Sequence, residues 1–228
     1  MNANNLKTKA VIFDFDGTLT KPNKYESSWE RTWAKIDKLD EDERLYNLFQ
    51  TNKLTFNQWL EEIFKVYKDS NVSISTFTEI ANETELIPNA EKTLKNLYEN
   101  NIKIFILSGG IGNIIQIKLK KILKYIEDIE AYFFEYDKNG IINNVTMPKL
   151  DVEDKSNYVN YIKDKYNLKK DEIVFIGNDK NDEDAYKTGI KTICINPNKA
   201  NYTDKKIWNH CILSSNNLED IEKYINFE

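Results

Sequence analysis

The stretch AVIFDFDGTLT, from Ala10 to Thr20, constrains the fold more than any other part of this sequence. Its first four residues, Ala10–Phe13, form an apolar run that is typical of a strand buried on both faces. Asp14 and Asp16 follow, and two carboxylates so spaced at the end of a strand would point together into the crevice where open α/β sheets bind ligands. Like charges placed there repel unless a cation or a shared proton compensates them. The stretch therefore predicts a metal site or an acid/base pair.

The rest of the chain alternates between apolar strand patterns and helical patterns. Strands are expected at 102–107, 132–134, 141–145, 173–176, 191–195 and 211–213, and helices at 88–98, 111–126, 154–166 and 218–225 with another that ends at 188. The segments 132–134 and 141–145 flank a turn and suit a short hairpin. Strands that alternate with helices predict a parallel sheet covered by helices on both faces.

Residues 25–82 break this alternation, because their apolar side chains recur only at helical spacing. Trp59, Ile63 and Tyr67 lie on one such helical face, and Thr55 suits the N-cap of their helix. The segment is therefore expected to be a small helical insertion folded over the site.

Overall composition limits the class of protein. The chain of 228 residues has a formal net charge of −5, with acidic and basic residues interspersed, so no basic face for nucleic acid is expected. The polar N-terminus and the short apolar run broken by Asp14 match neither a signal peptide nor a membrane span. The cysteines form no CxxC pair and indicate no disulfide framework, which favours a reducing, cytoplasmic compartment. The sequence does not predict an oligomeric state.

Polar clusters end three of the predicted strands. They are Asp14 with Asp16, then Ser108, and then Asn178 with Asp182. Because the carboxyl ends of parallel strands lie along one edge of a sheet, these clusters are expected to converge. Lys155 begins a predicted helix and is expected to approach the same edge from the side.

In this order the clusters resemble the motifs of the haloacid-dehalogenase superfamily of phosphatases, within its phosphoserine-phosphatase-like branch. The four matching segments are Asp14-Phe15-Asp16-Gly17-Thr18, Ser108-Gly109-Gly110, Lys155, and Gly177-Asn178-Asp179-Lys180-Asn181-Asp182. The resemblance implies an α/β fold with a Rossmann-like parallel-sheet core domain made of residues 1–20 and 87–228. An all-helical cap domain, residues 21–86, would be inserted after the first strand.

The resemblance also implies a Mg²⁺-dependent phosphatase that hydrolyses a small phosphorylated metabolite through an aspartyl-phosphate. Asp14 would attack phosphorus, while Asp16 would protonate the leaving oxygen and then activate water. Asp14, the backbone carbonyl of Asp16, Asn178 and Asp182 are the expected metal ligands. The groups expected to bind the phosphoryl oxygens are the amides of Phe15 and Gly109 and the side chains of Thr18, Ser108 and Lys155.

Two departures from the family pattern concern the metal and the substrate. Asn178 stands where the family usually has an aspartate, so Mg²⁺ would gain one negative charge fewer, unless Asp179 takes the role. Phosphoserine phosphatases carry a glutamate and an arginine in the cap that bind the substrate's amino-acid part. Those positions fall near Asn23 and near Glu61, and since the only arginines are Arg31 and Arg44, phosphoserine is disfavoured.

The tryptophans of the helical segment have two interpretations. Trp29, Trp33 and Trp59 suit the hydrophobic core of the cap, and the alternative is a surface that contacts the substrate. An aromatic cap would favour a phosphate ester with an apolar, ring or sugar portion. His210, the only histidine, lies far in sequence from every motif and is not expected to act in catalysis.

Alternative functions remain open on the same scaffold. A phosphotransferase or mutase would pass the phosphoryl group to an acceptor other than water, which depends on how water is excluded. A non-catalytic sensor of a phosphorylated metabolite is disfavoured because Asp14, Asp16 and Lys155 are all present. A dehalogenase is disfavoured because halide displacement does not need the proton chemistry of Asp16, and a phosphonate hydrolase because no lysine of the helical segment stands out.

Overall fold

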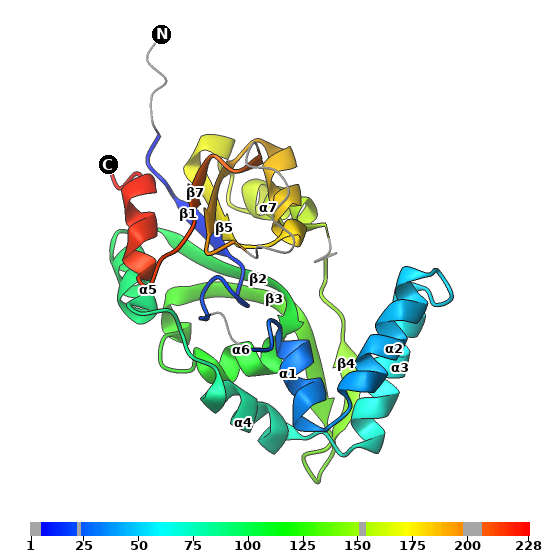
Figure 1. The fold of residues 1–228 in the computed structure, drawn as a ribbon. Coiled ribbons are helices and arrows are strands. Elements are labelled where there is room, and N and C mark those ends of the chain that lie inside the picture. The colour runs from blue at the N-terminus through cyan, green and yellow to red at the C-terminus, as the bar shows by residue number, and fades with distance from the viewer. Residues whose placement is uncertain (1–5, 22–23, 151–153, 198–206) are drawn as a thin grey trace.

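The computed structural model describes residues 6–21, 24–150, 154–197 and 207–228. Within these ranges seven strands form one sheet in the order β4-β3-β2-β1-β5-β6-β7 (Figure 1). Neighbouring strands are parallel, except that β3 and β4 form an antiparallel pair. The strands are β1 (Ala10–Phe13), β2 (Lys103–Ile111), β3 (Ile126–Tyr136), β4 (Ile142–Thr146), β5 (Ile173–Gly177), β6 (Lys191–Ile195) and β7 (His210–Ile212).

Helices flank this sheet and complete the predicted α/β fold. The α-helices are α1 (Ser28–Lys35), α2 (Leu39–Gln50), α3 (Phe56–Asp69), α4 (Ile74–Glu83), α5 (Ala90–Glu99), α6 (Gly112–Lys118) and α7 (Lys155–Lys165). The 3₁₀ segments are η1 (Leu123–Tyr125), η2 (Lys170–Glu172), η3 (Lys180–Thr188) and η5 (Leu218–Tyr224). In the described part of the chain, no helix combines the length and the apolar character that crossing a bilayer requires.

Strand β1 lies in the middle of the sheet, and its apolar run is explained by burial on both faces. It pairs with β2 on one side and β5 on the other, and none of its four side chains is exposed. Val11 and Phe13 belong to a hydrophobic cluster with residues of α5 and η5, whereas Ala10 and Ile12 join a cluster with residues of α7. This alternation follows from the two-residue period of a strand. It places Asp14 at the carboxyl end of the central strand.

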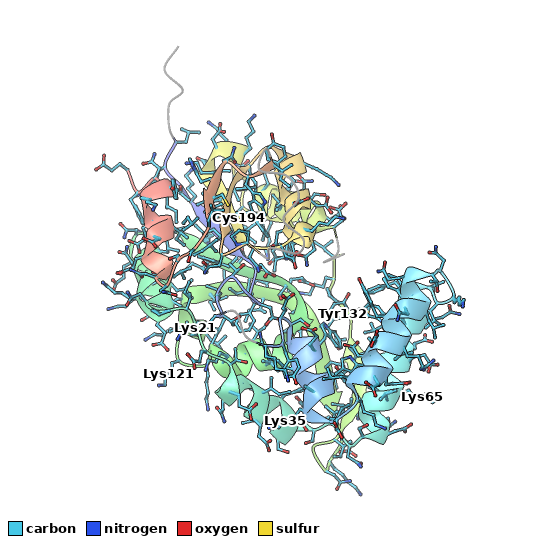
Figure 2. The ribbon with its side chains drawn as sticks, in the orientation of Figure 1. Lys21, Lys35, Lys65, Lys121, Tyr132 and Cys194 are labelled. Atoms are coloured by element: carbon cyan, nitrogen blue, oxygen red, sulfur yellow. The ribbon has the colours of Figure 1, made fainter. Side chains whose placement is uncertain are left out.

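Helices α1 to α4 follow β1 and pack on one end of the sheet. Trp33, Tyr67 and Phe77 from these helices share a third hydrophobic cluster with Phe134 of β3 and Ile114 of α6. Figure 1 shows α4 beside α6, and α2 and α3 side by side near β4. Lys35 of α1, labelled in Figure 2, pairs with Glu79 and Glu83 of α4 at 3.0 and 2.8 Å.

Local signals explain how these helices begin. The side chain of Thr55 accepts a hydrogen bond from the amide of Gln58, so the N-cap predicted for α3 is confirmed. Ser27 and Ser73 cap α1 and α4. In all three helices the third helical residue also accepts a hydrogen bond from the backbone amide of the cap residue, and this reciprocal pair is called a capping box. The cap at Ser27 fixes where α1 starts and therefore where Ser28, Trp29 and Arg31 lie relative to the sheet.

Predicted boundaries of β2, of α6 and of β3, which was expected only at 132–134, are wrong. Strand β2 does not end at Leu107 but continues to Ile111, with an irregular register between those residues. The helix expected at 111–126 ends at Lys118, and Ile126 instead begins β3, where it pairs with Ile104 of β2. Ile122 and Ile126 are four residues apart, a spacing that puts side chains on one face of a helix and also on one face of a strand. Pairing with β2 decides between the two.

Candidate active site

A cavity of about 830 Å³ opens at the carboxyl ends of the parallel strands, where α/β sheets usually bind ligands. Its walls come from the loops after β1, β5, β6 and β7, from the end of β2, and from the start of α1. The lining residues are Asp14, Asp16, Gly17, Glu26, Ser27, Trp29, Glu30, Ser108, Gly109, Gly110, Asn178, Asp179, Asn181, Asn196, Pro197, Leu213, Ser214, Ser215 and Asn216.

Behind one wall of this cavity lies a buried cluster of Asp14, Lys155 and Asp182. The ammonium of Lys155 is 2.9 Å from Asp14 Oδ1 and also donates to Asp182 Oδ1. Lys155 and Asp182 have no exposed surface, and Asp14 is 6% exposed. The second oxygen of Asp182 accepts hydrogen bonds from the amides of Asn178 and Asp179 at 2.8 and 3.0 Å. Asp182 therefore connects the loop after β5 to Lys155, and Lys155 connects α7 to Asp14.

The charge balance of this cluster favours a cation at its open side. Burial, helped by the charges of Asp182 and Asp16, raises the pKa of Asp14 to about 7 against the opposing charge of Lys155. Burial alone would lower the pKa of Lys155, but the charges of Asp14 and Asp182 outweigh it and raise that pKa. With Lys155 charged and both aspartates ionised, the cluster carries one net negative charge, and Asp16 adds another nearby. A cation bound beside Asp14 would favour its ionised form.

Asp16 also lines the cavity and is held there by α1. Its Oδ2 accepts a hydrogen bond from the amide of Ser28 at 3.0 Å, and its Oδ1 lies 3.1 Å from Nη1 of Arg31. A Cβ on Gly110 would stand 2.8 Å from Asp16 Oδ2 and 2.6 Å from Ser28 Oγ. Gly110 is thus required here because the helix and the end of β2 approach closely.

The loop after β1 is packed against the loop after β5. Gly17 has a φ of +76°, and a Cβ there would lie 2.3 Å from Asn178 Nδ2, so both backbone conformation and space require glycine. The hydroxyl of Thr18 donates to Asn178 Oδ1 at 3.1 Å. These contacts bring Asp16 and Asn178, which are distant in sequence, to the same cavity.

The structure brings together seven of the residues singled out from the sequence. Asp14, Asp16, Trp29, Ser108, Gly109, Asn178 and Asp179 line the cavity. Trp29 donates its indole N–H to the carbonyl of Gly109 at 2.7 Å, and Ser108 Oγ accepts a hydrogen bond from the amide of Gly110 at 3.1 Å. Their predicted convergence follows from the parallel strand order.

Other predicted site residues do not line the cavity. The side chain of Phe15 is buried in the cluster around β1, and the phosphate contact predicted for its backbone amide stays a prediction, whereas the unexposed hydroxyl of Thr18 donates to Asn178. Asp182 was expected to bind the metal, but both of its oxygens are taken by Lys155 and backbone amides, and it does not line the cavity. Lys155 likewise reaches the site only through Asp14.

Of the three tryptophans considered as substrate contacts, one lines the cavity and two do not. Trp33 has no exposed surface and packs edge-on against Tyr67 at 4.8 Å. Trp59 stacks on Phe49 at 4.9 Å, away from the cavity. Both serve the hydrophobic packing of the helices, and only Trp29 lies at the site. Asn23 lies outside the described residues.

Sequence reasoning missed several residues at or behind the cavity. Arg31 pairs with Asp16. The one sequence signal that could have pointed to it is that arginine is rare in this chain and that Arg31 lies one helical turn after the cap of α1. Asn181 and the loops that contain Asn196 and residues 213–216 also line the cavity. Because those loops follow β6 and β7, the rule used for Asp14 and Ser108 would have included them.

The oxygen atoms around the cavity fit a hard divalent cation. Asp14, Asp16 and Asn178 offer carboxylate, backbone carbonyl and amide oxygens, and Asp16 Oδ1 is buried and accepts no hydrogen bond from any residue that the structure describes. The described ranges contain no group of three or more histidine, cysteine, aspartate or glutamate side chains poised to hold a metal. One or two carboxylates supplemented by neutral oxygens and water is the pattern typical of Mg²⁺ rather than of zinc.

Removing the negative charge of Asp182 should destabilise the protein strongly. The Asp182→Asn variant leaves buried Lys155 with one carboxylate, and breaking a buried pair costs roughly 3–5 kcal/mol of unfolding free energy. Urea denaturation monitored by circular dichroism measures the loss. Asp184→Asn is the matched control on the same 3₁₀ segment, because its partner Lys187 is 68% exposed and Asp184 itself is only partly buried, and it should lose less than about 1 kcal/mol. Equal losses in the two variants would contradict this account of the cluster.

Comparison with solved structures supports the fold. The chain is similar to a phosphoserine phosphatase in apo form, with a TM-score of 0.74 and 20% identity over 96% of this chain and 100% of that one. A phospho-aspartyl intermediate analogue of phosphoserine phosphatase matches with a TM-score of 0.71 and 21% identity over 96% and 100% of the two chains. A phosphoserine phosphohydrolase-like protein from Francisella tularensis subsp. tularensis SCHU S4 matches with a TM-score of 0.63 and 21% identity over 96% and 100%.

Comparison of sequences identifies the family. No curated protein matches the chain. The family model described as haloacid dehalogenase-like hydrolase matches residues 8–188, a range that runs from before β1 to the end of η3 and contains Asp14, Lys155 and Asp182. This range is most of the chain and includes the polar clusters predicted from the sequence at the ends of strands. The chain therefore belongs to the haloacid dehalogenase-like hydrolase family.

Proposed function

We propose that this protein is a Mg²⁺-dependent phosphatase that hydrolyses a small phosphomonoester by way of phosphorylated Asp14. The observation that carries the proposal is the position of Asp14. It is anchored by buried Lys155 at 2.9 Å and shares one cavity with Asp16, Ser108 and Asn178. Phosphoryl transfer depends mainly on such positioning and on compensation of charge.

In the first step a carboxylate oxygen of Asp14 bonds to phosphorus, and the bond between phosphorus and the leaving oxygen breaks. Asp16, which lines the same cavity, gives its proton to that oxygen. In the second step Asp16 takes a proton from water, the water oxygen bonds to phosphorus, and the bond to Asp14 breaks to release inorganic phosphate. Lys155 stabilises the charge on Asp14 throughout, and Ser108 is placed to hold a phosphoryl oxygen.

Asp14, the carbonyl of Asp16 and Asn178 would hold the metal. Mg²⁺ bound there would offset the negative charges of Asp14 and of the phosphate. Asp182 is not among the proposed ligands because Lys155 and two amides occupy its oxygens.

Loss of the nucleophile is the first test. The wild-type protein with Mg²⁺ should release nitrophenolate from p-nitrophenyl phosphate, and Asp14→Asn should reduce kcat by more than about 10³-fold. Asparagine has nearly the shape of aspartate, so circular dichroism should show the variant folded. Equal rates in the folded variant and the wild type would rule out Asp14 as the nucleophile.

The metal assignment predicts a gain from Asn178→Asp. The added charge should tighten Mg²⁺ binding by roughly three- to tenfold, because carboxylate ligands bind Mg²⁺ more strongly than amides. A Mg²⁺ titration of activity measures the change, and activity itself should persist. If this variant shows no change while Asp179→Asn abolishes Mg²⁺ binding, Asp179 rather than Asn178 is the ligand.

The charge of the cavity limits the substrate class. Among the described lining residues, every charged side chain is acidic: Asp14, Asp16, Glu26, Glu30 and Asp179. The phosphate of a substrate would lie at the metal, while a second negative charge elsewhere on the substrate would find only carboxylates among the charged lining side chains that the structure describes. We propose that the organic part of the substrate is neutral or cationic.

Phosphoserine and phosphoethanolamine test this proposal because they differ only by a carboxylate. The value of kcat/KM should be at least about tenfold higher for phosphoethanolamine, since one like-charge contact costs on the order of 1 kcal/mol or more. Steady-state phosphate release measures both under the same conditions. A preference for phosphoserine would show that a basic group reaches the substrate's carboxylate.

A further inference from the structure

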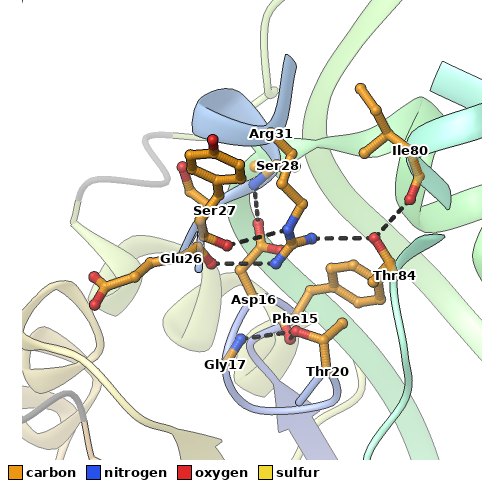
Figure 3. Close-up of polar contacts among 12 residues, drawn as sticks. Phe15, Asp16, Gly17, Thr20, Glu26, Ser27, Ser28, Arg31, Ile80 and Thr84 are labelled. Atoms are coloured by element: carbon orange, nitrogen blue, oxygen red, sulfur yellow. Dashed lines mark hydrogen bonds and ion pairs between the residues drawn. The ribbon is translucent and has the colours of Figure 1, made fainter. Parts of the chain in front are cut away.

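Arg31 is a buried arginine that contacts the site without lining it. It lies on α1, is 7% exposed, and its guanidinium is 3.1 Å from Asp16 Oδ1 (Figure 3). It is absent from the residues that line the cavity. Any effect of Arg31 on the reaction would therefore be exerted through Asp16, the one acidic side chain with which it pairs among the residues described.

The guanidinium is fixed in orientation by contacts on its other sides. Nη1 also donates to the hydroxyl of Thr84 at 3.3 Å, and Thr84 in turn donates to the carbonyl of Ile80 at 2.8 Å (Figure 3). Nε and Nη2 donate to the carbonyls of Tyr25 and Glu26, each at 3.3 Å. The planar fork of an arginine suits this arrangement, because its donors diverge in fixed directions.

Asp16 is confined by three neighbours. Arg31 is beside Oδ1, the amide of Ser28 donates to Oδ2 at 3.0 Å, and Gly110 leaves no space for even a Cβ beside Oδ2. Oδ1 pairs with Arg31 by charge alone and accepts no hydrogen bond within the described residues. Arg31 is thus the contact that determines which way this oxygen faces.

We propose that Arg31 is a positioning residue that holds the carboxyl of Asp16 in line with the leaving oxygen of the substrate. The proposal rests on the proposed function, in which Asp16 transfers the proton. Two of the three contacts that confine Asp16 come from α1, so proton transfer depends on that helix being docked. Without Arg31, the carboxyl would still be present but free to rotate away from the leaving oxygen.

The test compares two leaving groups. An alkyl alkoxide such as that of phosphoethanolamine must be protonated as it leaves, whereas nitrophenolate need not be. The value of kcat/KM reports the steps up to transfer of the phosphoryl group to Asp14. Arg31→Gln should therefore lower kcat/KM for phosphoethanolamine by about 10²-fold and for p-nitrophenyl phosphate by less than about tenfold. Arg31→Lys should recover part of the selective loss, because it restores the charge without the fork.

Controls separate positioning from general damage. Arg44→Gln removes the chain's other arginine, whose pair with Glu41 is exposed, and should leave both substrates unchanged. If Arg31→Gln does not fold, Thr84→Val removes one contact that orients the guanidinium while keeping its charge, and should give a weaker loss of the same selectivity. In an Asp16→Asn background, Arg31→Gln should produce no further loss, since both changes act on one step.

The outcomes distinguish this proposal from the proposed function. If Asp16→Asn loses phosphoethanolamine hydrolysis selectively but Arg31→Gln affects both substrates equally, or adds its effect to that of Asp16→Asn, the positioning role of Arg31 is overturned alone. If Asp16→Asn retains full activity on both substrates, the proton-transfer role of Asp16 is overturned, and the role of Arg31 with it.

Discussion

A buried ammonium between two carboxylates is the interaction on which the rest of this site depends. Lys155 begins α7, Asp14 ends the central strand, and Asp182 belongs to the segment after β5. An ion buried this deeply is tolerated only when it is paired, so the three elements must meet in one arrangement. The amides of Asn178 and Asp179 on Asp182 extend this arrangement to the cavity wall. The same contacts that satisfy Lys155 thus place the proposed nucleophile and a proposed metal ligand side by side.

The part of the site around Asp16 is built differently. It depends on α1, one of the helices that lie between β1 and β2 in the chain. Ser28 and Arg31 hold Asp16, and the indole of Trp29 donates to Gly109. Helix α1 therefore contacts both the loop after β1 and the end of β2. One helix thus contributes to the cavity lining through Trp29 and orients Asp16, which is the structural basis for the role proposed for Arg31.

The strands of the sheet could be predicted from sequence because burial on both faces leaves a continuous apolar run. The runs that became β1, β5 and β6 match the predicted strands to within one residue. The end of β2 and the start of β3 could not, because glycine after serine suggests a turn and a four-residue spacing of isoleucines fits helix and strand alike. Pairing between distant strands decided both, and a single sequence does not contain that information.

At the site, sequence identified the side chains that end strands but not those that support them. Asp14, Asp16, Ser108 and Asn178 follow from their places after apolar runs, and all four line the cavity. The contact of Arg31 with Asp16 depends on how α1 docks, and the contact of Lys155 with one oxygen of Asp182 depends on the position of α7. Trp33 and Trp59 were ambiguous because helical spacing does not say which face meets the sheet and which meets a ligand.

The central claim is that Asp14 accepts the phosphoryl group. Acid quenching of the protein during turnover with Mg²⁺ and a phosphomonoester, followed by peptide mass spectrometry, locates a phosphoryl group on any residue directly. If Asp14 is the nucleophile, the quenched protein should carry a hydroxylamine-labile phosphoryl group on Asp14. A phosphoryl group found on another residue would contradict this role of Asp14. So would turnover in which samples quenched at successive times during the first turnover hold no phosphoryl group on the protein.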